Sequence, residues 1–170
     1  MYWKPIKYFS NPIALLTVFI LLLSGVFTAQ ATTEFTAKIK EAMIAMQIQA
    51  VKLGEPKIDG TALFFGTTKM NGNYQLVDDL KTRFGCTATF FIKKGDQFIR
   101  ISTNVLKDGN RAIGTPLDPM GAAIAAISKG ASFYGVVDIL GSLYDTGYEP
   151  INNAAGEIIG IYYIGFPMKQ

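Results

Sequence analysis

The chain of 170 residues has no histidine, and this absence excludes more chemistry than any other feature of the composition. Without imidazole there is no Ser-His-Asp or Cys-His arrangement, no histidine-ligated zinc and no side chain whose ordinary pKa lies near neutrality. Catalysis would need a carboxyl, lysine or tyrosine with a strongly shifted pKa. We therefore predict a protein that is not an enzyme and that uses no metal or cofactor.

The chain also has little cysteine and a low net charge. Cys86 is the single cysteine, so neither an intramolecular disulfide nor a thiolate metal cage can form. Its small and β-branched neighbours predict a buried thiol that packs like a small apolar side chain. The formal charge is only +3, and Lys4 and Lys7 precede every acidic residue. The remaining charge is too weak and too scattered for a nucleic-acid partner.

One long apolar run, residues 13–27, follows the two N-terminal lysines. It ends before Ala29-Gln30-Ala31, small residues at the positions that a signal peptidase reads. This pattern predicts a signal peptide over residues 1–31 that is cleaved after Ala31.

The alternative for the same segment is an uncleaved inner-membrane anchor over residues 13–31. The run extended to Ala31 approaches the roughly 20 residues that cross a bilayer. Either way, the domain over residues 32–170 is expected outside the cytoplasmic membrane, in the periplasm.

The rest of the chain predicts one α+β domain with an antiparallel sheet of about five strands, a long N-terminal helix and short helices. The expected elements are a helix over 34–53, a short strand over 62–65, a short helix ending at Gly85, strands over 87–93 and 97–105, a helix over 119–129 with Asp118 as its cap, and strands over 132–140, 142–151 and 157–166.

The first helix carries apolar residues at three- and four-residue spacing, namely Ile39, Met43, Met46, Ala50 and Leu53. This stripe either packs on the protein's own sheet or forms a surface for a partner.

Four blocks then resemble a known family: residues 98–105, 111–116, 144–151 and 156–165. Together they are similar to the single Cache domains of the Cache 3/Cache 2 fusion type, extracytoplasmic sensor modules with a PAS-like sheet. The resemblance implies recognition of a small molecule, commonly a short organic acid, in signal transduction such as chemotaxis. Such domains usually lie between two membrane helices of chemoreceptors and sensor kinases. Because this chain stops at Gln170, we expect a free-standing module that presents its bound state to a membrane receptor or kinase.

Alternate side chains of a strand share a face. In the strand over 97–105, one face should hold Ile99, Ile101, Thr103 and Val105, and the other Phe98, Arg100, Ser102 and Asn104. Tyr144, Thr146 and Tyr148 should likewise share a face. A guanidinium matches both oxygens of a carboxylate, so Arg100 is the expected anchor, with Arg111 in reserve. The candidate ligand-binding residues are Arg100, Ser102, Asn104, Arg111, Thr115, Tyr144, Thr146 and Tyr148.

Two alternatives remain open at this point. Arg100 could instead pair with Asp138 or Asp145 across the sheet, which would make it a structural residue. The chain could also be an interaction protein that retains the sensor fold without a ligand and forms a homodimer through its N-terminal helix.

Overall fold

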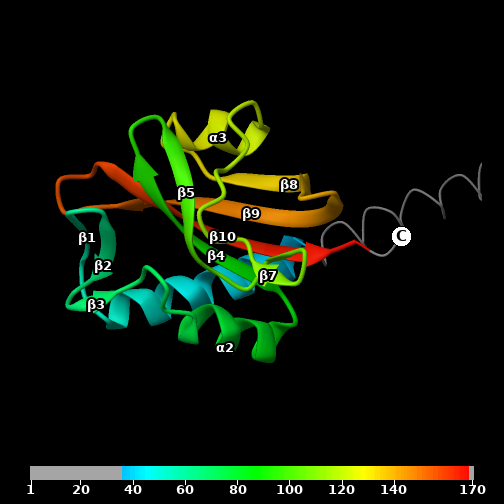
Figure 1. Ribbon diagram of the computed structural model, residues 1–170, viewed down its shortest axis with the longest axis horizontal. Helices are drawn as coiled ribbons and strands as arrows, with labels where there is room; N and C mark the ends of the chain where they lie inside the picture. Colours follow the sequence, from blue (N-terminus) through cyan, green and yellow to red (C-terminus); the bar gives the residue numbers. More distant parts are fainter. Residues whose placement is uncertain (1–35, 169–170) are drawn as a thin grey trace, which may run out of the picture. The chain divides into compact units, whose positions relative to one another are not determined.

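A computed structural model describes residues 36–168, and its centre is an antiparallel sheet with the strand order β5-β4-β10-β9-β8 (Figure 1). The strands are β4 (Thr87–Lys94), β5 (Gln97–Thr103), β8 (Phe133–Ile139), β9 (Ser142–Asn152) and β10 (Ile158–Pro167). Their alternating apolar residues and short glycine-containing links predict these strands, and the α+β class is confirmed. The predicted leader or anchor over residues 1–31 lies outside the described residues.

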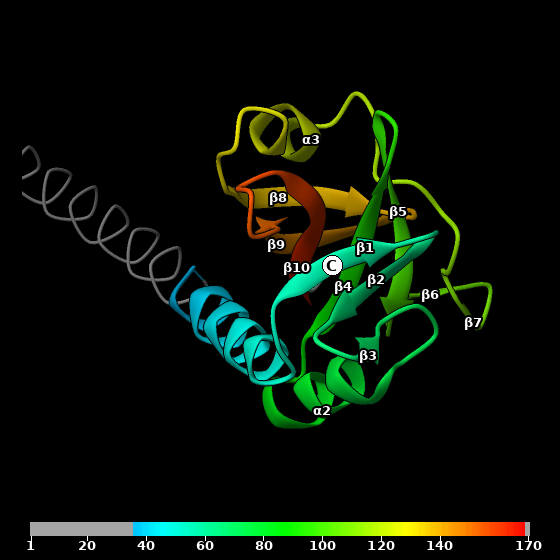
Figure 2. The same cartoon turned by 90° about the vertical axis from the view of Figure 1, so that its left-hand side faces the viewer.

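Two helices cover one face of this sheet: the N-terminal helix, described over residues 36–52, and α2 (Gln75–Phe84) (Figure 2). The N-terminal helix buries Ile39, Met43, Met46 and Ala50 in a core that includes Phe90 of β4. Four residues of the predicted stripe thus pack on the protein's own sheet, whereas the fifth, Leu53, lies just beyond the helix and is exposed.

The opposite face of the sheet is covered by α3 (Ala122–Ile127) and by the segment that precedes it. This helix is shorter than the predicted 119–129. Asp118 does not cap it, because its carboxylate accepts the backbone N–H of Met120 in a tight turn and Gly121 has extended backbone at the helix start. Gly130, with φ of +76°, follows its end.

Short strands complete the fold. β1 (Pro56–Asp59), β2 (Ala62–Phe65) and β3 (Thr68–Lys69) form a small sheet, and β6 (Leu106–Lys107) pairs with β7 (Asn110–Arg111). Only β2 was predicted, because β3, β6 and β7 are two residues long and carry no periodicity, and β1 is a mostly exposed strand that begins with a proline. The small sheet meets the end of the N-terminal helix at Gly66, where a Cβ atom would lie 2.2 Å from the Leu53 carbonyl oxygen.

Candidate functional site

A β-bulge in β5 decides which way Arg100 points. In the ladder with β4, Arg100 pairs with Phe91 and Ser102 pairs with Phe90, so Ile101 is the extra residue. Arg100 therefore lies on the face covered by α3, together with Phe91, and Ser102 lies on the helix-covered face. The predicted shared face of Arg100, Ser102 and Asn104 is wrong for this reason.

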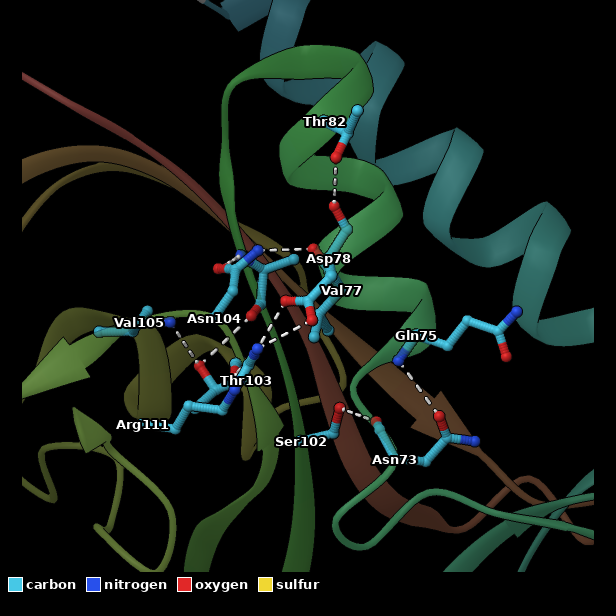
Figure 3. Close-up of polar contacts among 11 residues, drawn as sticks. Asn73, Gln75, Val77, Asp78, Thr82, Ser102, Thr103, Asn104, Val105 and Arg111 are labelled. Carbon is cyan, nitrogen blue, oxygen red and sulfur yellow. Dashed lines mark hydrogen bonds and ion pairs between the residues drawn. The ribbon is translucent and has the colours of Figure 1, made fainter.

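Ser102 and Asn104 hold the α2 region against the sheet (Figure 3). The Ser102 hydroxyl donates to the Asn73 carbonyl oxygen at 2.5 Å. The Asn104 amide donates to the Val77 carbonyl oxygen at 2.5 Å and accepts the Ala88 backbone N–H at 2.7 Å. Both side chains are buried and hydrogen bonded to backbone, so we exclude them from the candidate site.

Arg111 is also engaged on the helix-covered side of the molecule. Its guanidinium donates to both carboxylate oxygens of Asp78 at 2.8 Å and to the Thr103 carbonyl oxygen at 2.8 Å (Figure 3). It also lies 4.3 Å from the centre of the Tyr74 ring, a cation–π contact. Hydrogen bonding to Asp78 raises the pKa of Arg111. This clamp ties β7 to α2 and does not contribute to a site at Arg100.

Arg100 is a buried cation whose charge no carboxylate neutralises within residues 36–168. Only 4% of the residue is exposed. One terminal nitrogen donates to the Thr115 hydroxyl at 2.8 Å and to the Pro116 carbonyl oxygen at 3.4 Å, and the guanidinium lies 5.0 Å from the centre of the Phe91 ring. Burial lowers the pKa of Arg100, although the group remains protonated. The expected alternative pairing with Asp138 or Asp145 is not formed.

The segment 112–117 closes over Arg100 by pairing with β5. The Arg100 backbone N–H donates to the Thr115 carbonyl oxygen at 3.0 Å, and the Gly114 N–H donates to the Arg100 carbonyl oxygen at 2.9 Å. The Thr115 hydroxyl donates onward to the Ala112 carbonyl oxygen at 2.8 Å. Thr115, which was predicted as a ligand-binding residue, thus lies next to Arg100 and forms part of its cover.

Tyr148 is the second unusual group on this face. It is fully buried, its ring centre lies 5.0 Å from that of Tyr163 and 6.1 Å from that of Phe133, and its hydroxyl has no hydrogen-bond partner. Burial raises the pKa of Tyr148, while the Arg100 charge acts in the opposite direction. The hydroxyl therefore stays protonated and is available as a donor.

The other predicted side chains of β9 lie on the same face as Tyr148, because the ladder between β9 and β10 is regular in this stretch. Tyr144 is half-buried and packs against the cluster that contains Tyr148. The Thr146 hydroxyl donates to the Gly135 carbonyl oxygen at 2.6 Å, so it is already satisfied.

Sequence reasoning missed Phe91 and Tyr163, which lie between Arg100 and Tyr148 in the sheet order. Tyr163 shares a hydrogen bond of 3.1 Å with the Thr87 hydroxyl. Both β4 and β10 are buried on both faces, so their near-continuous apolar sequence gives no sign of which side chains face the site.

Within residues 36–168, the buried side-chain nitrogen and oxygen atoms without a partner are Arg100 Nε and Tyr148 Oη. Two surface cavities, of about 580 and 630 Å³, lie elsewhere: the first lies beside Gln49 and Asp79, and the second beside Lys93 and Glu157. Neither cavity is lined by Arg100. Arg100 and Tyr148 therefore lie on the α3-covered face of the sheet, with segment 112–117 closed over Arg100.

Comparison with known proteins agrees with this architecture. The model of the Cache 3/Cache 2 fusion domain family matches residues 14–170. The chain belongs to this family. It is therefore a Cache domain of the extracytoplasmic sensor type, a non-enzymatic class that binds small molecules and signals to partners. Within residues 36–168, no helix has the length and hydrophobicity of a membrane span.

A search of curated proteins gave no match. Among solved structures, the Cache domain is similar to a protein described as a transcriptional regulator from Rhodococcus sp. RHA1. The two are 16% identical, the match covers 71% of this chain and 70% of the other, and the TM-score is 0.41.

Proposed function

We propose that this Cache domain is an exported, periplasmic sensor that binds a small carboxylate at Arg100 and presents the bound state to a membrane receptor or kinase. The observation that carries the proposal is the pair of buried, unsatisfied polar atoms, Arg100 Nε and Tyr148 Oη. An unpaired buried donor costs about 1–3 kcal/mol, and more when it is charged. Both atoms are donors on one face of the sheet, so a bound carboxylate would supply the acceptors that they lack.

Charge and geometry favour a carboxylate. The Nε–H of Arg100 lies on the guanidinium edge that can bind both oxygens of a carboxylate side by side. Tyr148 supplies a neutral hydroxyl donor on the same face. Because the described residues supply no second unpaired cation there, the site suits a single negative charge.

Access requires the cover to open. Arg100 is buried beneath segment 112–117, and Gly114 in this segment has φ of +79°. An opening must break the three backbone hydrogen bonds between the segment and β5, at Gly114, Thr115 and Leu117. A ligand oxygen that replaces the Thr115 hydroxyl would preserve a partner for the Arg100 terminal nitrogen. A four-atom acid such as acetate could gain at most about 6 kcal/mol, which corresponds to a dissociation constant of tens of micromolar.

The proposal is tested by thermal unfolding of the full chain with sodium acetate, propionate, lactate, pyruvate, succinate and the neutral amino acids. A ligand at 100 times its dissociation constant should add about 2.7 kcal/mol of stability. The response should disappear in Arg100→Lys and persist in Arg111→Lys, whose guanidinium is engaged with Asp78. A flat response to the whole panel, or a shift that survives Arg100→Lys, contradicts the proposal.

A second candidate function, homodimer formation, has its own observation. The N-terminal helix carries a second apolar stripe on its outer side, formed by Ile44, Ile48 and Val51, which are 56%, 51% and 61% exposed. We propose a second copy of this chain as its partner. Glu41 and Lys52 flank the stripe near opposite ends, so antiparallel pairing centred between residues 46 and 47 brings each Glu41 opposite the partner's Lys52.

Sedimentation equilibrium measures this association directly. A dimer that dissociates in Ile48→Glu supports it, with Ile58→Glu, an exposed apolar residue away from the helix, as the control. A monomer at every concentration up to the millimolar range rules it out.

A further inference from the structure

Strand β9 faces the candidate site on one side and the N-terminal helix on the other. Tyr148 points to the α3-covered face beside Tyr163, and the next residue, Glu149, points to the helix-covered face. Because adjacent residues of a strand face opposite ways, any shift of this backbone moves both side chains together. The candidate site and the helix therefore share one structural element.

Glu149 is a half-buried carboxylate that joins three elements. One oxygen accepts the hydroxyl of Tyr134 on β8, and the other accepts the side-chain amide of Gln47 on the N-terminal helix at 2.6 Å. Within residues 36–168, it forms no ion pair with a lysine or arginine. Burial, and then the hydrogen bond to Glu149, raise the pKa of Tyr134. The Glu149 carboxylate is thus held by two neutral donors. Because one of them, Gln47, lies on the N-terminal helix, a movement of the helix changes the hydrogen bonding of the carboxylate.

The helix also packs tightly at this point. A Cβ atom at Gly147 would lie 2.8 Å from Ile39 Cγ2 on the helix and 2.8 Å from Tyr134 Cε1. The Lys40 ammonium group lies 5.6 Å from the centre of the same tyrosine ring. Gly147 and Glu149 therefore contact the helix region, while Thr146 and Tyr148 face the other side. The residues that contact the helix and those that face the candidate site are consecutive residues of one strand.

We propose that Glu149 is a positioning residue that couples occupation of the Arg100 site to the position of the N-terminal helix. This inference rests on the proposed function. A ligand that bonds the Tyr148 hydroxyl draws β9 toward α3, and the Glu149 carboxylate moves with it, away from Gln47. The ligand then favours one helix position over the other by its differential affinity for the two arrangements. Linkage makes the effect reciprocal, so a change in the balance of helix positions, caused by loss of the Glu149–Gln47 bond, also changes ligand affinity.

The test uses NMR of the isotopically labelled full chain with the same panel of sodium carboxylates. The Arg100 Nε–Hε signal reports occupation of the site, and the Gln47 side-chain amide signal reports the link. We expect every acid that shifts the first signal to shift the second and to change amide hydrogen exchange in residues 36–52 by about 5-fold or more. In Glu149→Ala, which removes the acceptor of the Gln47 amide, the Arg100 response should remain and the helix response should disappear, whereas Glu157→Ala, in the β9–β10 turn, should retain both.

Reciprocity supplies a second measurement, in a variant that removes the helix side of the link to Glu149. Gln47→Ala should change the dissociation constant of the acid by about 5-fold or more. Gln49→Ala should leave it unchanged, because the Gln49 amide donates to Asp79 on α2 and not to the sheet. A shift at Arg100 with a silent Gln47 signal, or equal affinities in the two variants, overturns the coupling and leaves the proposed function intact. If no acid shifts Arg100, the proposed function fails and the coupling fails with it.

Discussion

Arg100→Met should make the ligand-free protein more stable. The residue is 4% exposed and carries a charge that no carboxylate of the described residues pairs with. Methionine has a similar unbranched stem and can pack against Phe91 and the cover without burying a charge. An arginine that only held the fold together would show the opposite effect on substitution.

The magnitude follows from opposing terms. Burial of an uncompensated ion is unfavourable by several kcal/mol even after local relaxation. Against this stand the bond to Thr115 at 2.8 Å, the longer bond to the Pro116 carbonyl and the contact with Phe91, together worth about 2–4 kcal/mol. Thr115 is not orphaned by the change, because its hydroxyl already donates to Ala112. The net expectation is a gain of about 1–2 kcal/mol, within the range measured when buried ionic groups are replaced by apolar ones.

Urea unfolding at neutral pH measures this difference, and an unchanged m-value shows that the denatured state is not altered. The melting temperature should rise by about 4 °C per kcal/mol for a domain of this size. Arg111→Met is the matched control with the opposite sign, because it breaks a paired guanidinium and should lower stability by about 1 kcal/mol. If Arg100→Met lowers stability by more than about 1 kcal/mol, Arg100 is a structural residue and the reasoning from its unpaired charge is refuted.

Three further predictions follow from single contacts. Tyr148→Phe removes an unpartnered hydroxyl and should raise the free energy of unfolding by about 1 kcal/mol. Tyr163→Phe breaks the hydrogen bond to Thr87 and should lower the free energy of unfolding by about as much. Equal effects of the two variants in urea unfolding would contradict this. Gly160→Ala should destabilise the protein by about 3 kcal/mol, because its Cβ atom would lie 2.4 Å from a backbone carbonyl oxygen of β4, and a loss below about 1 kcal/mol would show that the strands can separate. Burial raises the pKa of Cys86 from 9.0 to about 11. The neutral thiol therefore stabilises the folded protein fully below about pH 9, and the free energy of unfolding should fall by about 2–3 kcal/mol as the pH rises to about 11. Cys86→Ala should remove this fall from the plot of stability against pH, and parallel plots for the two proteins would refute the prediction.

The sequence was informative where structure follows from local periodicity. The stripe from Ile39 to Ala50 recurs every three or four residues and is buried as predicted. The alternation of Tyr144, Thr146 and Tyr148 also survives, because the β9 ladder is regular there. The family resemblance drawn from four sequence blocks agrees with the match over residues 14–170.

The orientation of side chains in β5 could not be predicted, because a bulge is a property of two strands. Ile101 has no partner on β4, and this one-residue shift sends Ser102 and Asn104 to the opposite face from Arg100. Arg111 was similarly ambiguous, since its carboxylate partner Asp78 lies 33 residues earlier in the chain. The sequence identified the residues with bonding capacity, and the tertiary pairing decided which of them remain free.

The hydrogen bonding of these side chains distinguishes structural from functional polarity. Ser102, Asn104 and Arg111 are all hydrogen bonded to neighbouring backbone or side chains, and together they fasten β5 and β7 to the α2 region. Natural proteins satisfy nearly all buried polar groups, so an exception needs an explanation. Arg100 Nε and Tyr148 Oη are exceptions on one face of one sheet, under a cover that a glycine-containing segment supplies. Both atoms are hydrogen-bond donors, and one belongs to a cation, so together they match a carboxylate on that face.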